Sequence, residues 1–533
     1  MFLSKKKASA DYKNLRRVFT VPEGRSSTLS QIEKEISKNI QGFLSQHIVS
    51  GDAGPEELEC NFQSTSIPEE PIFVSEQADF LLSKVVSQSV HTSSPSFIGH
   101  MTSALPYFML PLGKIMMALN QNLVKIETSK AFTPLERQVI AMLHNLVYGF
   151  GEDFYKKTAQ DRYHSLGVFC SGGTVANVTS LWVARNKLLG PDGDFLGVNE
   201  EGLYRALRHY NLEGLAILVS KRGHYSLSKA CDALGIGKRY LVAVDTDQDG
   251  RLDVEQLEVE IHALREAKIG VVGVVGIAGT TETGQVDPLE EIGEVCRRLG
   301  CYYHIDASWG GPTLFSERYG QILNGIDQAD SVSIDAHKQL YVPMGAGMAL
   351  FRDHQDLGFI EQNAQYVIRS GSRDLGKRSL EGSRPGMAMM VHSALHVLGR
   401  KGYELLIDHG IDLAKKMAGM ILESDDFELT TEPNLNILTY RYVPEEFRDA
   451  LANSGEQQQR NLNRRLNQLT IAIQKKQRSD GKTFVSRTRL DLPQYADQSI
   501  DVFRVVLANP LTDESIIKMV LDEQRQIASE LGD

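Results

Sequence analysis

From about residue 165 to 352, short apolar runs alternate with segments of helical character. Alternation of this kind is typical of βαβ units, so it predicts an α/β fold with a mostly parallel sheet. Ligands bind at the carboxyl ends of parallel strands, which makes the residues directly after each run the first candidates for a functional site. The apolar runs lie at 215–220, 240–244, 271–277, 302–305 and 331–334.

The segments outside this region predict a different organisation. Residues 1 to about 70 are polar and broken by turn-forming stretches, which predicts an irregular extension. Apolar residues recur at helical spacing over 105–150, where Thr133-Pro134 is typical of a helix start. From about 386 a long helical stretch precedes the strand-like pieces LNILTYRYV and VFRVVLANP and a final helix. We expect an N-terminal extension with a helical segment (1–115), a large α/β domain (116–385) and a small C-terminal α+β domain (386–533).

The composition narrows the partners and the location of the protein. Its net charge of −11 argues against a general nucleic-acid binder. The five cysteines lack C-x-x-C spacing, so we expect reduced thiols with neither a disulfide framework nor a zinc site. No apolar run approaches the ~20 residues that cross a bilayer, and the basic N-terminus lacks the apolar core of a signal peptide. We expect a cytoplasmic protein without a membrane or nucleic-acid partner; a weak tether through the basic N-terminus is the alternative.

The stretch DTDQDGRLDVEQ, residues 245–256, resembles a calcium-binding loop. Acids stand at its first, third and fifth positions and Gly250 at the sixth, but Gln256 replaces the bidentate glutamate of the twelfth. The preceding run YLVAV is typical of a strand, whereas a calcium loop of this kind follows a helix. We therefore interpret the stretch as an acidic β-turn before a helix that starts after Asp253, and predict no metal site.

Glycines follow the apolar stretch at the start of the alternating region. In GVFCSGGTVANVTSLWVARNKLL, Gly172 and Gly173 stand between a strand end and a helical pattern, flanked by Ser171 and Thr174. Glycine lets backbone amides approach an anion, and a helix N-terminus adds unpaired N–H groups. The pattern predicts a phosphate cradle, with a simple helix cap as the alternative. The stretch has no Walker lysine, which disfavours a nucleoside triphosphate.

A carboxylate and an amine follow two later runs. Asp306 ends the run in CYYHIDASWGG, where a buried carboxylate is costly unless it meets a cation or a strong donor. A protonated pyridine nitrogen would satisfy it, and a strand-end cap is the alternative. Lys338 follows SVSIDAH and is either a solvated side chain or an amine that reacts with an aldehyde. Together, Thr174, Asp306 and Lys338 provide the three anchors that pyridoxal phosphate needs.

From about residue 95 to the C-terminus, the sequence resembles the group II pyridoxal-phosphate-dependent amino-acid decarboxylases. This is the family of glutamate, cysteine-sulfinate and aromatic amino-acid decarboxylases. SGGTVAN resembles its phosphate loop, HIDASWGG its HVDAAWGG and DAHK its NPHK, and RGHYSLSKACDALGIG, AGTTETGQVDPLEEI and FRVVLANP resemble further motifs. The resemblance implies the type I fold of pyridoxal-dependent transferases, pyridoxal 5'-phosphate as cofactor, and a homodimer with active sites near the subunit interface.

Position by position, the resemblance implies a role for each matching residue. Gly173 and Thr174 would bind the phosphate, and Asp306 would pair with the ring nitrogen. Lys338 would hold the cofactor covalently, and Arg504 would bind a substrate carboxylate. The remaining expected contacts are His224 stacked on the ring, Thr281 near its 3-hydroxyl, Ser308 near the ring where the family has alanine, and His337 beside phosphate and substrate. From the residues alone, a helix cap at His224 and a surface arginine at Arg504 are the alternatives.

The sequence departs from the family pattern at two points. Asp335 stands where the family has an asparagine that contacts the phosphate. An acid beside a dianion is repulsive, so it must point away, be protonated or be offset by a cation. Many members also place on a mobile loop a tyrosine that protonates Cα, but Arg373 occupies that position here. Tyr366, upstream in the same loop, is the candidate for this catalytic role.

The resemblance also narrows the substrate to an acidic L-amino acid. SIDAHKQLYVPMGAG and LEGSRPGMAM most resemble a bacterial branch of the family that converts L-aspartate into β-alanine for pantothenate synthesis. Glutamate and cysteine sulfinate are the alternatives, because one methylene or one sulfinate is worth only ~1–3 kcal/mol of discrimination. The same fold and cofactor also support an aminotransferase, a lyase of another type or a non-catalytic homologue.

Overall fold

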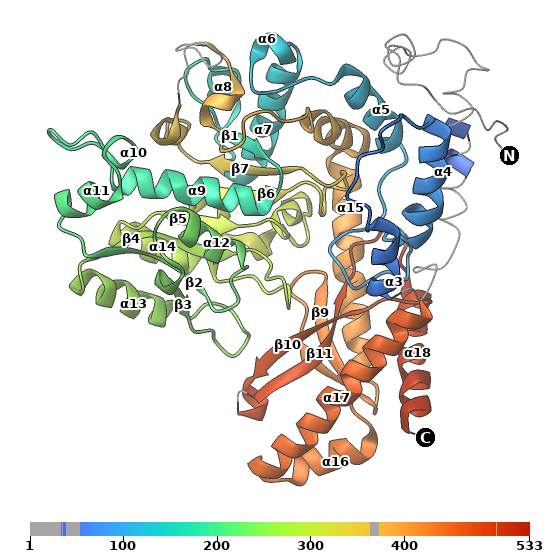
Figure 1. Cartoon of the computed structure of the whole chain (residues 1–533). Helices are drawn as coiled ribbons and strands as arrows, with labels where there is room; N and C mark the ends of the chain where they lie inside the picture. Colours follow the sequence, from blue (N-terminus) through green and yellow to red (C-terminus); the bar gives the residue numbers. More distant parts are fainter. Residues whose placement is uncertain (1–32, 35, 39–53, 363–371, 497, 533) are drawn as a thin grey trace.

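The computed structural model describes residues 33–34, 36–38, 54–362, 372–496 and 498–532 (Figure 1). Its larger sheet has seven strands in the order β1-β7-β6-β5-β4-β2-β3. Strands β2 to β6 run parallel, whereas β7 is antiparallel to both of its neighbours. The strands are β1 (Gly167–Cys170), β2 (Gly214–Ser220), β3 (Leu241–Val244), β4 (Ile269–Ile277), β5 (Tyr303–Asp306), β6 (Ser331–Asp335) and β7 (Gly347–Phe351).

This sheet confirms the α/β fold and the five strands predicted from the apolar runs, with ends that differ by one or two residues. Strand β7 was not predicted. Its sequence GMALF is short, and it forms a strand because it pairs antiparallel between β1 and β6. Such a pairing depends on tertiary context, which periodicity along the chain does not contain.

Helices cover both faces of this sheet, as Figure 1 shows for α9 on the near side. Side chains alternate along a strand. In β2, Ile217 and Val219 pack with α9 (Gly173–Leu188) and α12 (Ser226–Ala233). Leu218 belongs instead to the core formed with α13 (Val254–Glu266) and α14 (Leu289–Leu299). Burial on both faces explains why these strands are continuous apolar runs in the sequence.

The C-terminal part forms a second sheet with the order β10-β11-β9-β8, which is antiparallel throughout. The predicted strand pieces and the final helix are confirmed, whereas α17 was not predicted. Gly399 interrupts α15 with a φ of 64°. The elements are α15 (Ala388–Leu422), β8 (Phe427–Thr431), β9 (Ile437–Tyr442), α16 (Glu445–Asn453), α17 (Glu456–Asp480), β10 (Ser486–Leu492), β11 (Gln498–Val506) and α18 (Glu514–Gly532).

The described part of the N-terminal extension corrects one expectation. Residues 55–59 form a helix, because Pro55 stands at its first position and Glu56 and Glu57 favour its positive end. The division of the chain at 115 and 385 stays a prediction. The helices before and within the larger sheet are α3 (Pro55–Glu59), α4 (Val74–Lys84), α5 (Met109–Leu119), α6 (Ile126–Ser129), α7 (Phe132–Tyr148), α8 (Glu152–Thr158), α10 (Val198–Glu201) and α11 (Leu203–His209).

One further contact brings the N-terminal part of the chain close to the site. The amide of Ile98 donates to the carbonyl of Phe484 (3.0 Å), and the amide of Val506 donates to that of Ile98 (2.7 Å). The chain before α5 therefore packs against the second sheet and brings residues 99–101 close to β11. Within the described ranges, no helix is both long and apolar enough to cross a membrane. Short 3-10 helices occupy connections: η1 (Cys60–Phe62), η2 (Val86–Gln88), η3 (Lys238–Tyr240), η4 (Gly311–Phe315), η5 (Gly320–Leu323), η6 (Ile326–Gln328), η7 (Asp356–Ile360), η8 (Leu375–Arg378) and η9 (Pro493–Tyr495).

Candidate active site

A cavity of about 360 Å³ lies at the carboxyl ends of β4, β5 and β6, beside the first turn of α9. The structure brings most of the predicted site residues together in its walls. Arg504 is not part of the lining, and Tyr366 lies outside the described residues. The individual roles of these side chains stay predictions. The predicted residues in the walls are Gly173, Thr174, His224, Thr281, Asp306, Ser308, His337 and Lys338.

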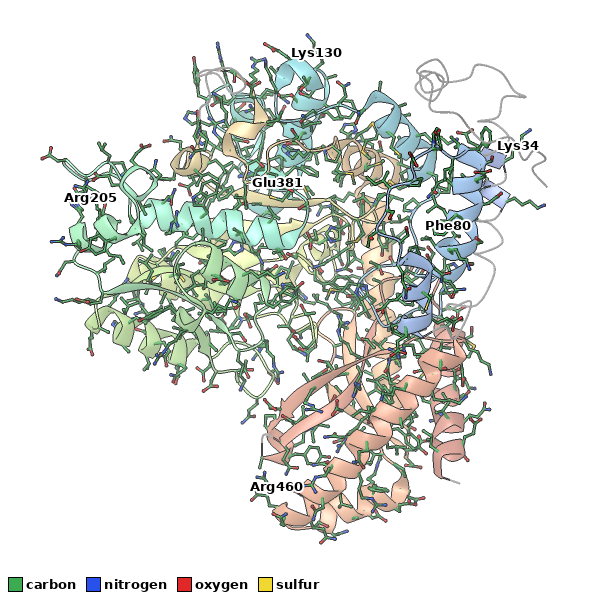
Figure 2. All side chains as sticks on the ribbon, viewed as in Figure 1. Lys34, Phe80, Lys130, Arg205, Glu381 and Arg460 are labelled. Atoms are coloured by element: carbon green, nitrogen blue, oxygen red, sulfur yellow. The ribbon has the colours of Figure 1, made fainter. Side chains whose placement is uncertain are left out.

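The turn before α9 leaves backbone open to the cavity. A Cβ atom at Gly173 would lie 2.5 Å from Oγ of Ser308 and 2.8 Å from Oδ2 of Asp335, so the position fits only glycine. The first amides of a helix have no partner within it and lie at the positive end of its dipole. Just before the turn, the amide of Ser171 donates to Oε2 of Glu381 (3.0 Å), a residue labelled in Figure 2. The turn is therefore shaped for an anion such as a phosphate.

Asp306 is a buried carboxylate at the end of β5. Its Oδ1 accepts from the amide of Ser308 (3.1 Å) and the hydroxyl of Ser333 (3.2 Å), and its Oδ2 accepts from Nδ2 of Asn177 (2.7 Å). Burial alone raises the pKa of this carboxyl. Hydrogen bonds from Ser308 and Asn177 and the charge of Lys338 outweigh burial and hold the pKa below its ordinary value of 3.8. Asp306 is therefore charged at neutral pH and suited to a protonated ring nitrogen.

Asn177 connects Asp306 to His224. Its Nδ2 also donates to Oγ of Ser226 (3.0 Å), which lies 2.9 Å from Nδ1 of His224. The amide of Ser226 donates to the same Nδ1 (3.2 Å), so Nδ1 is an acceptor and the ring proton resides on Nε2. Burial lowers the pKa of His224, which makes the ring neutral at pH 7. Behind this network, Nε2 of His304 lies 3.1 Å from Oδ1 of Asn177.

Lys338 is paired with an acid of its own segment. Its Nζ lies 3.0 Å from Oδ2 of Asp335, the last residue of β6. Nε2 of His337 is 3.7 Å from the same oxygen, and its Nδ1 is 2.9 Å from the carbonyl of Ala346. Among the described residues, the other oxygen of Asp335 is buried without a hydrogen-bond partner. Of the three possibilities for this acid, the structure shows the one in which a cation offsets its charge.

Arg504 lies on β11, next to the cavity wall. Its Nε donates to the carbonyl of Thr281 (2.6 Å) and its Nη1 to that of Gly99 (3.4 Å). Its Nη2 and Oε2 of Glu282 are both buried and have no hydrogen-bond partner within the described ranges. Burial lowers the pKa of Arg504 to about 10, and the charge of Glu282 opposes this shift. Neither Glu282 nor Asn177 had a predicted role, because no spacing rule connects them to the partners that the fold provides.

The residues around the cavity fit pyridoxal phosphate. The glycine turn offers amides to a phosphate, Asp306 offers a charge to a ring nitrogen, and Lys338 offers a primary amine to an aldehyde. These three groups lie in the walls of one cavity, and Nη2 of Arg504 is a buried donor that still needs an acceptor. Gly173, Thr174 and Lys338 are therefore the residues that would hold the cofactor, with Asp306 at its ring.

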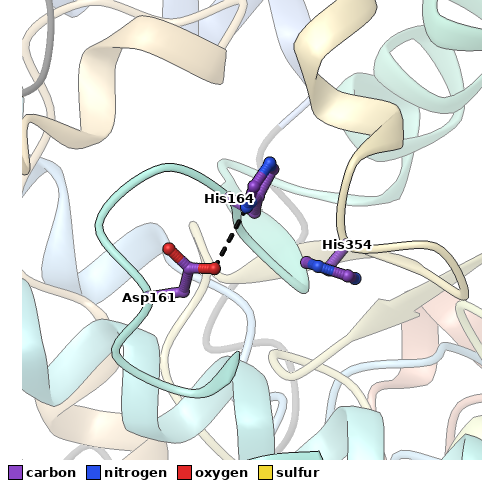
Figure 3. Close-up of side chains that lie close together, drawn as sticks. All are labelled: Asp161, His164 and His354. Atoms are coloured by element: carbon purple, nitrogen blue, oxygen red, sulfur yellow. Dashed lines mark hydrogen bonds and ion pairs between the residues drawn. The ribbon is translucent and has the colours of Figure 1, made fainter. Parts of the chain in front are cut away.

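A second polar cluster lies outside this cavity (Figure 3). Nδ1 of His164 is 3.0 Å from Oδ2 of Asp161, and the nearest ligand atoms of these two residues and His354 lie within 4.8 Å of one another. Guanidinium groups contact the same loop: Nη2 of Arg137 donates to the carbonyl of His164 (2.8 Å), and Arg378 donates to another carbonyl. Positive charge disfavours a bound cation. We interpret the cluster as contacts that fix the loop.

The predicted acidic turn at residues 245–256 is confirmed. The amide of Gly250 donates to the carbonyl of Asp247 (3.0 Å), which closes the turn. Oδ1 of Asp253 accepts from the amides of Glu255 (3.0 Å) and Gln256 (3.1 Å) and caps α13. The acids of this stretch therefore form a turn and a helix cap.

Comparisons with known proteins show what the chain is similar to. Residues 61–443 match a protein family described as "Pyridoxal-dependent decarboxylase conserved domain". An aspartate 1-decarboxylase of Aliivibrio fischeri is 56% identical over 529 residues, which cover 99% of this chain and 97% of that protein. An acidic amino acid decarboxylase GADL1 of Mus musculus is 29% identical over 83% of this chain and 75% of that protein. The crystal structure of mouse CSAD has a TM-score of 0.81 and 25% identity and covers 95% of this chain and 99% of that one.

Proposed function

The chain belongs to the pyridoxal-dependent decarboxylase family, and on this basis we propose that it converts L-aspartate into β-alanine and carbon dioxide. The protein is an amino-acid decarboxylase that uses pyridoxal 5'-phosphate. The observation that carries the substrate is the similarity, over almost the whole length of both chains, to an aspartate 1-decarboxylase. Supply of β-alanine for pantothenate synthesis belongs to the same proposal.

Each site residue has its own role in the proposed reaction. When bound, pyridoxal phosphate supplies an electron sink for the bond between Cα and the departing carboxylate. Lys338 provides the amine that holds the aldehyde, with Asp335 as its counter-ion in the structure. Asp306 is charged, so it is placed to keep a proton on the ring nitrogen. Tyr366 stays the candidate that delivers a proton to Cα.

The second carboxylate of the substrate needs a cation. Arg504 has a free donor, Nη2, which is buried and has no hydrogen-bond partner in the described chain, although the charge of Glu282 acts on the guanidinium group. Its other nitrogens are fixed by the carbonyls of Thr281 and Gly99, so the guanidinium is held in place before a ligand binds. A carboxylate at Nη2 would form a charge-assisted hydrogen bond, which is roughly twice as strong as a neutral one. This supports an acidic substrate and a substrate-binding role for Arg504.

We also propose that the protein forms a homodimer and is located in the cytoplasm. Large apolar side chains are exposed along α4 and α5, among them Phe80 (labelled in Figure 2), Leu81, Leu110 and Met117. A second copy of the chain that covered them would remove this apolar surface from water. All five cysteines are unpaired, which supports a reducing compartment. Light scattering of the purified protein tests the assembly: a dimer mass is expected, and a monomer mass would contradict it.

Product analysis tests the function. Cofactor-loaded protein is offered L-aspartate, L-glutamate, cysteine sulfinate and an aromatic amino acid, each in a separate reaction. We expect β-alanine from aspartate as the main activity, and none from the Lys338→Ala control. A preference for glutamate or cysteine sulfinate would show that the enzyme is a decarboxylase of another acidic amino acid. A keto acid in place of carbon dioxide would assign another reaction class.

A further inference from the structure

Arg222 lies between the active-site cavity and a second, larger cavity, and we propose that it selects acidic substrates by binding their extra carboxylate where the two cavities meet. The inference rests on the proposed function and deepens it, because it concerns the substrate class of the same cavity. Arg222 is not among the site residues that were predicted from the sequence. It follows β2, two residues before His224.

Its position connects the two cavities. Arg222 lines the active-site cavity and also a cavity of about 840 Å³ between the turn at 245–251 and strands β8 and β10. The side chain is half-buried. Its amide donates to Oγ of Ser220 (3.1 Å), and its Nη2 reaches the carbonyl of Asp491 at 3.5 Å, the limit of a hydrogen bond. The backbone is therefore fixed, while the guanidinium keeps most of its donors available for a ligand.

Its charge distinguishes it from the other cations of the outer cavity. Nη2 of Arg251 lies 2.8 Å from Oδ2 of Asp247, and Nζ of Lys221 lies 3.6 Å from Oδ1 of Asp245. Among the residues that the structure describes, Arg222 forms no ion pair with a carboxylate. Arg222 therefore has no direct counter-ion, whereas the neighbouring cations do, although five carboxylates also line the outer cavity: those of Asp245, Asp247, Asp249, Glu432 and Asp491.

A cation without a direct counter-ion can bind a carboxylate at short range. The low-dielectric walls around Arg222 strengthen this contact once the carboxylate reaches the guanidinium group. Free L-aspartate has two carboxylates and one ammonium group and is a net anion, whereas a neutral amino acid has no net charge to attract. Arg222 and Arg504 then act at different depths, the first at the junction of the cavities and the second against Thr281.

Steady-state kinetics with matched variants test the inference. For Arg222→Gln, we expect KM for L-aspartate to rise about tenfold with kcat within about twofold, because the charge acts on binding and not on the bond that breaks. The fall of kcat/KM with added salt should weaken, since screening acts on the charge that the variant lacks. Arg222→Lys should recover most of the loss. The control Lys221→Gln should leave KM unchanged, because that ammonium group is paired with Asp245.

A second measurement does not depend on turnover. Calorimetry of the cofactor-loaded protein with succinate, a dicarboxylate without an amine, should show binding to the wild type that weakens about tenfold in Arg222→Gln. An unchanged KM and unchanged succinate affinity in Arg222→Gln would overturn the inference, as would an equal loss in Lys221→Gln. If the wild type makes no β-alanine from aspartate, the proposed function fails, and the succinate comparison still decides the role of Arg222.

Discussion

Asn177 donates from Nδ2 to Oδ2 of Asp306 across 2.7 Å, and the same amide nitrogen reaches Oγ of Ser226 at 3.0 Å. One side chain on α9 thus orients both the acid at the end of β5 and, through Ser226, the neutral ring of His224. The amide is held in turn by His304. A single buried amide therefore connects the two groups that are predicted to contact the cofactor ring from different elements.

Replacing this amide is expected to weaken cofactor binding. Asn177→Ala removes a hydrogen bond to a charged acceptor, worth about 1.5–3 kcal/mol, so affinity for pyridoxal phosphate should fall roughly tenfold or more. Visible absorbance during titration of the apoprotein measures this affinity. Asn186→Ala is the matched control, because Asn186 is buried on the same helix but bonds the carbonyl of Phe359 (2.8 Å). Equal affinities in Asn177→Ala and the wild type would contradict the network.

The charge of Asp306 is expected to matter more than its shape. Asp306→Asn keeps the size of the side chain but removes the negative charge that would hold a proton on the ring nitrogen. We expect kcat to fall at least ~100-fold, about 2.7 kcal/mol, with an unchanged circular dichroism spectrum. Asp306→Glu keeps the charge and should retain more activity than Asp306→Asn. Full activity in Asp306→Asn would exclude this role.

Asp335 is expected to weaken the hold on the cofactor. Its carboxylate packs against the glycine turn and is paired with the amine that would react with the aldehyde. Asp335→Asn removes a negative charge from beside the phosphate cradle, so the apoprotein should bind pyridoxal phosphate a few-fold more tightly. Fluorescence titration measures the change, with Glu381→Gln as a comparison acid near the same turn. Weaker binding in Asp335→Asn would show instead that the acid helps to hold the cofactor.

The fold is expected to lose stability in mild acid. Burial lowers the pKa of His144 and of His304 to about 4, below their ordinary value of 6.5. As the pH falls from 6.5 toward 4, the unfolded chain takes up these protons before the native one, which favours unfolding by up to about 3 kcal/mol per histidine. Asp287, whose pKa burial raises to about 7, acts in the opposite sense and offsets part of this loss.

Urea unfolding at pH 7 and pH 5 measures this dependence. The free energy of unfolding should be lower at pH 5, and His144→Gln should reduce the difference between the two values because glutamine does not titrate in this range. A larger free energy of unfolding at pH 5 would show that Asp287 and other carboxyls outweigh the two histidines.

The sequence was sufficient for the strands that pattern alone defines, but not for elements that depend on distant partners. Apolar runs buried on both faces predicted β2 to β6 to within two residues. The antiparallel strand β7 and the largely polar helix α17 were missed, because their stability comes from β1 and β6 in one case and from the second sheet in the other.

The same division holds for the site. Strand ends and a glycine turn predicted Asp306, Lys338 and Gly173 as site residues, and the structure places all three in the walls of one cavity. Asn177 and Glu282 could not be found in this way. The role of an amide in the middle of a helix, or of an acid in a loop, depends on the side chains that the fold packs beside it. Arg222 could not be predicted either, because only the fold shows that two cavities meet at its side chain.

Isotope tracing of the reaction shows which bond of the substrate is broken. Cofactor-loaded protein is incubated with L-aspartate labelled with carbon-13 at its α-carboxyl carbon. We expect all of the label to leave as carbon dioxide, in equal amount to the unlabelled β-alanine that forms, and Lys338→Ala to form neither. Labelled alanine, or retention of the label in any amine product, would mean that another bond is broken and would contradict decarboxylation at Cα.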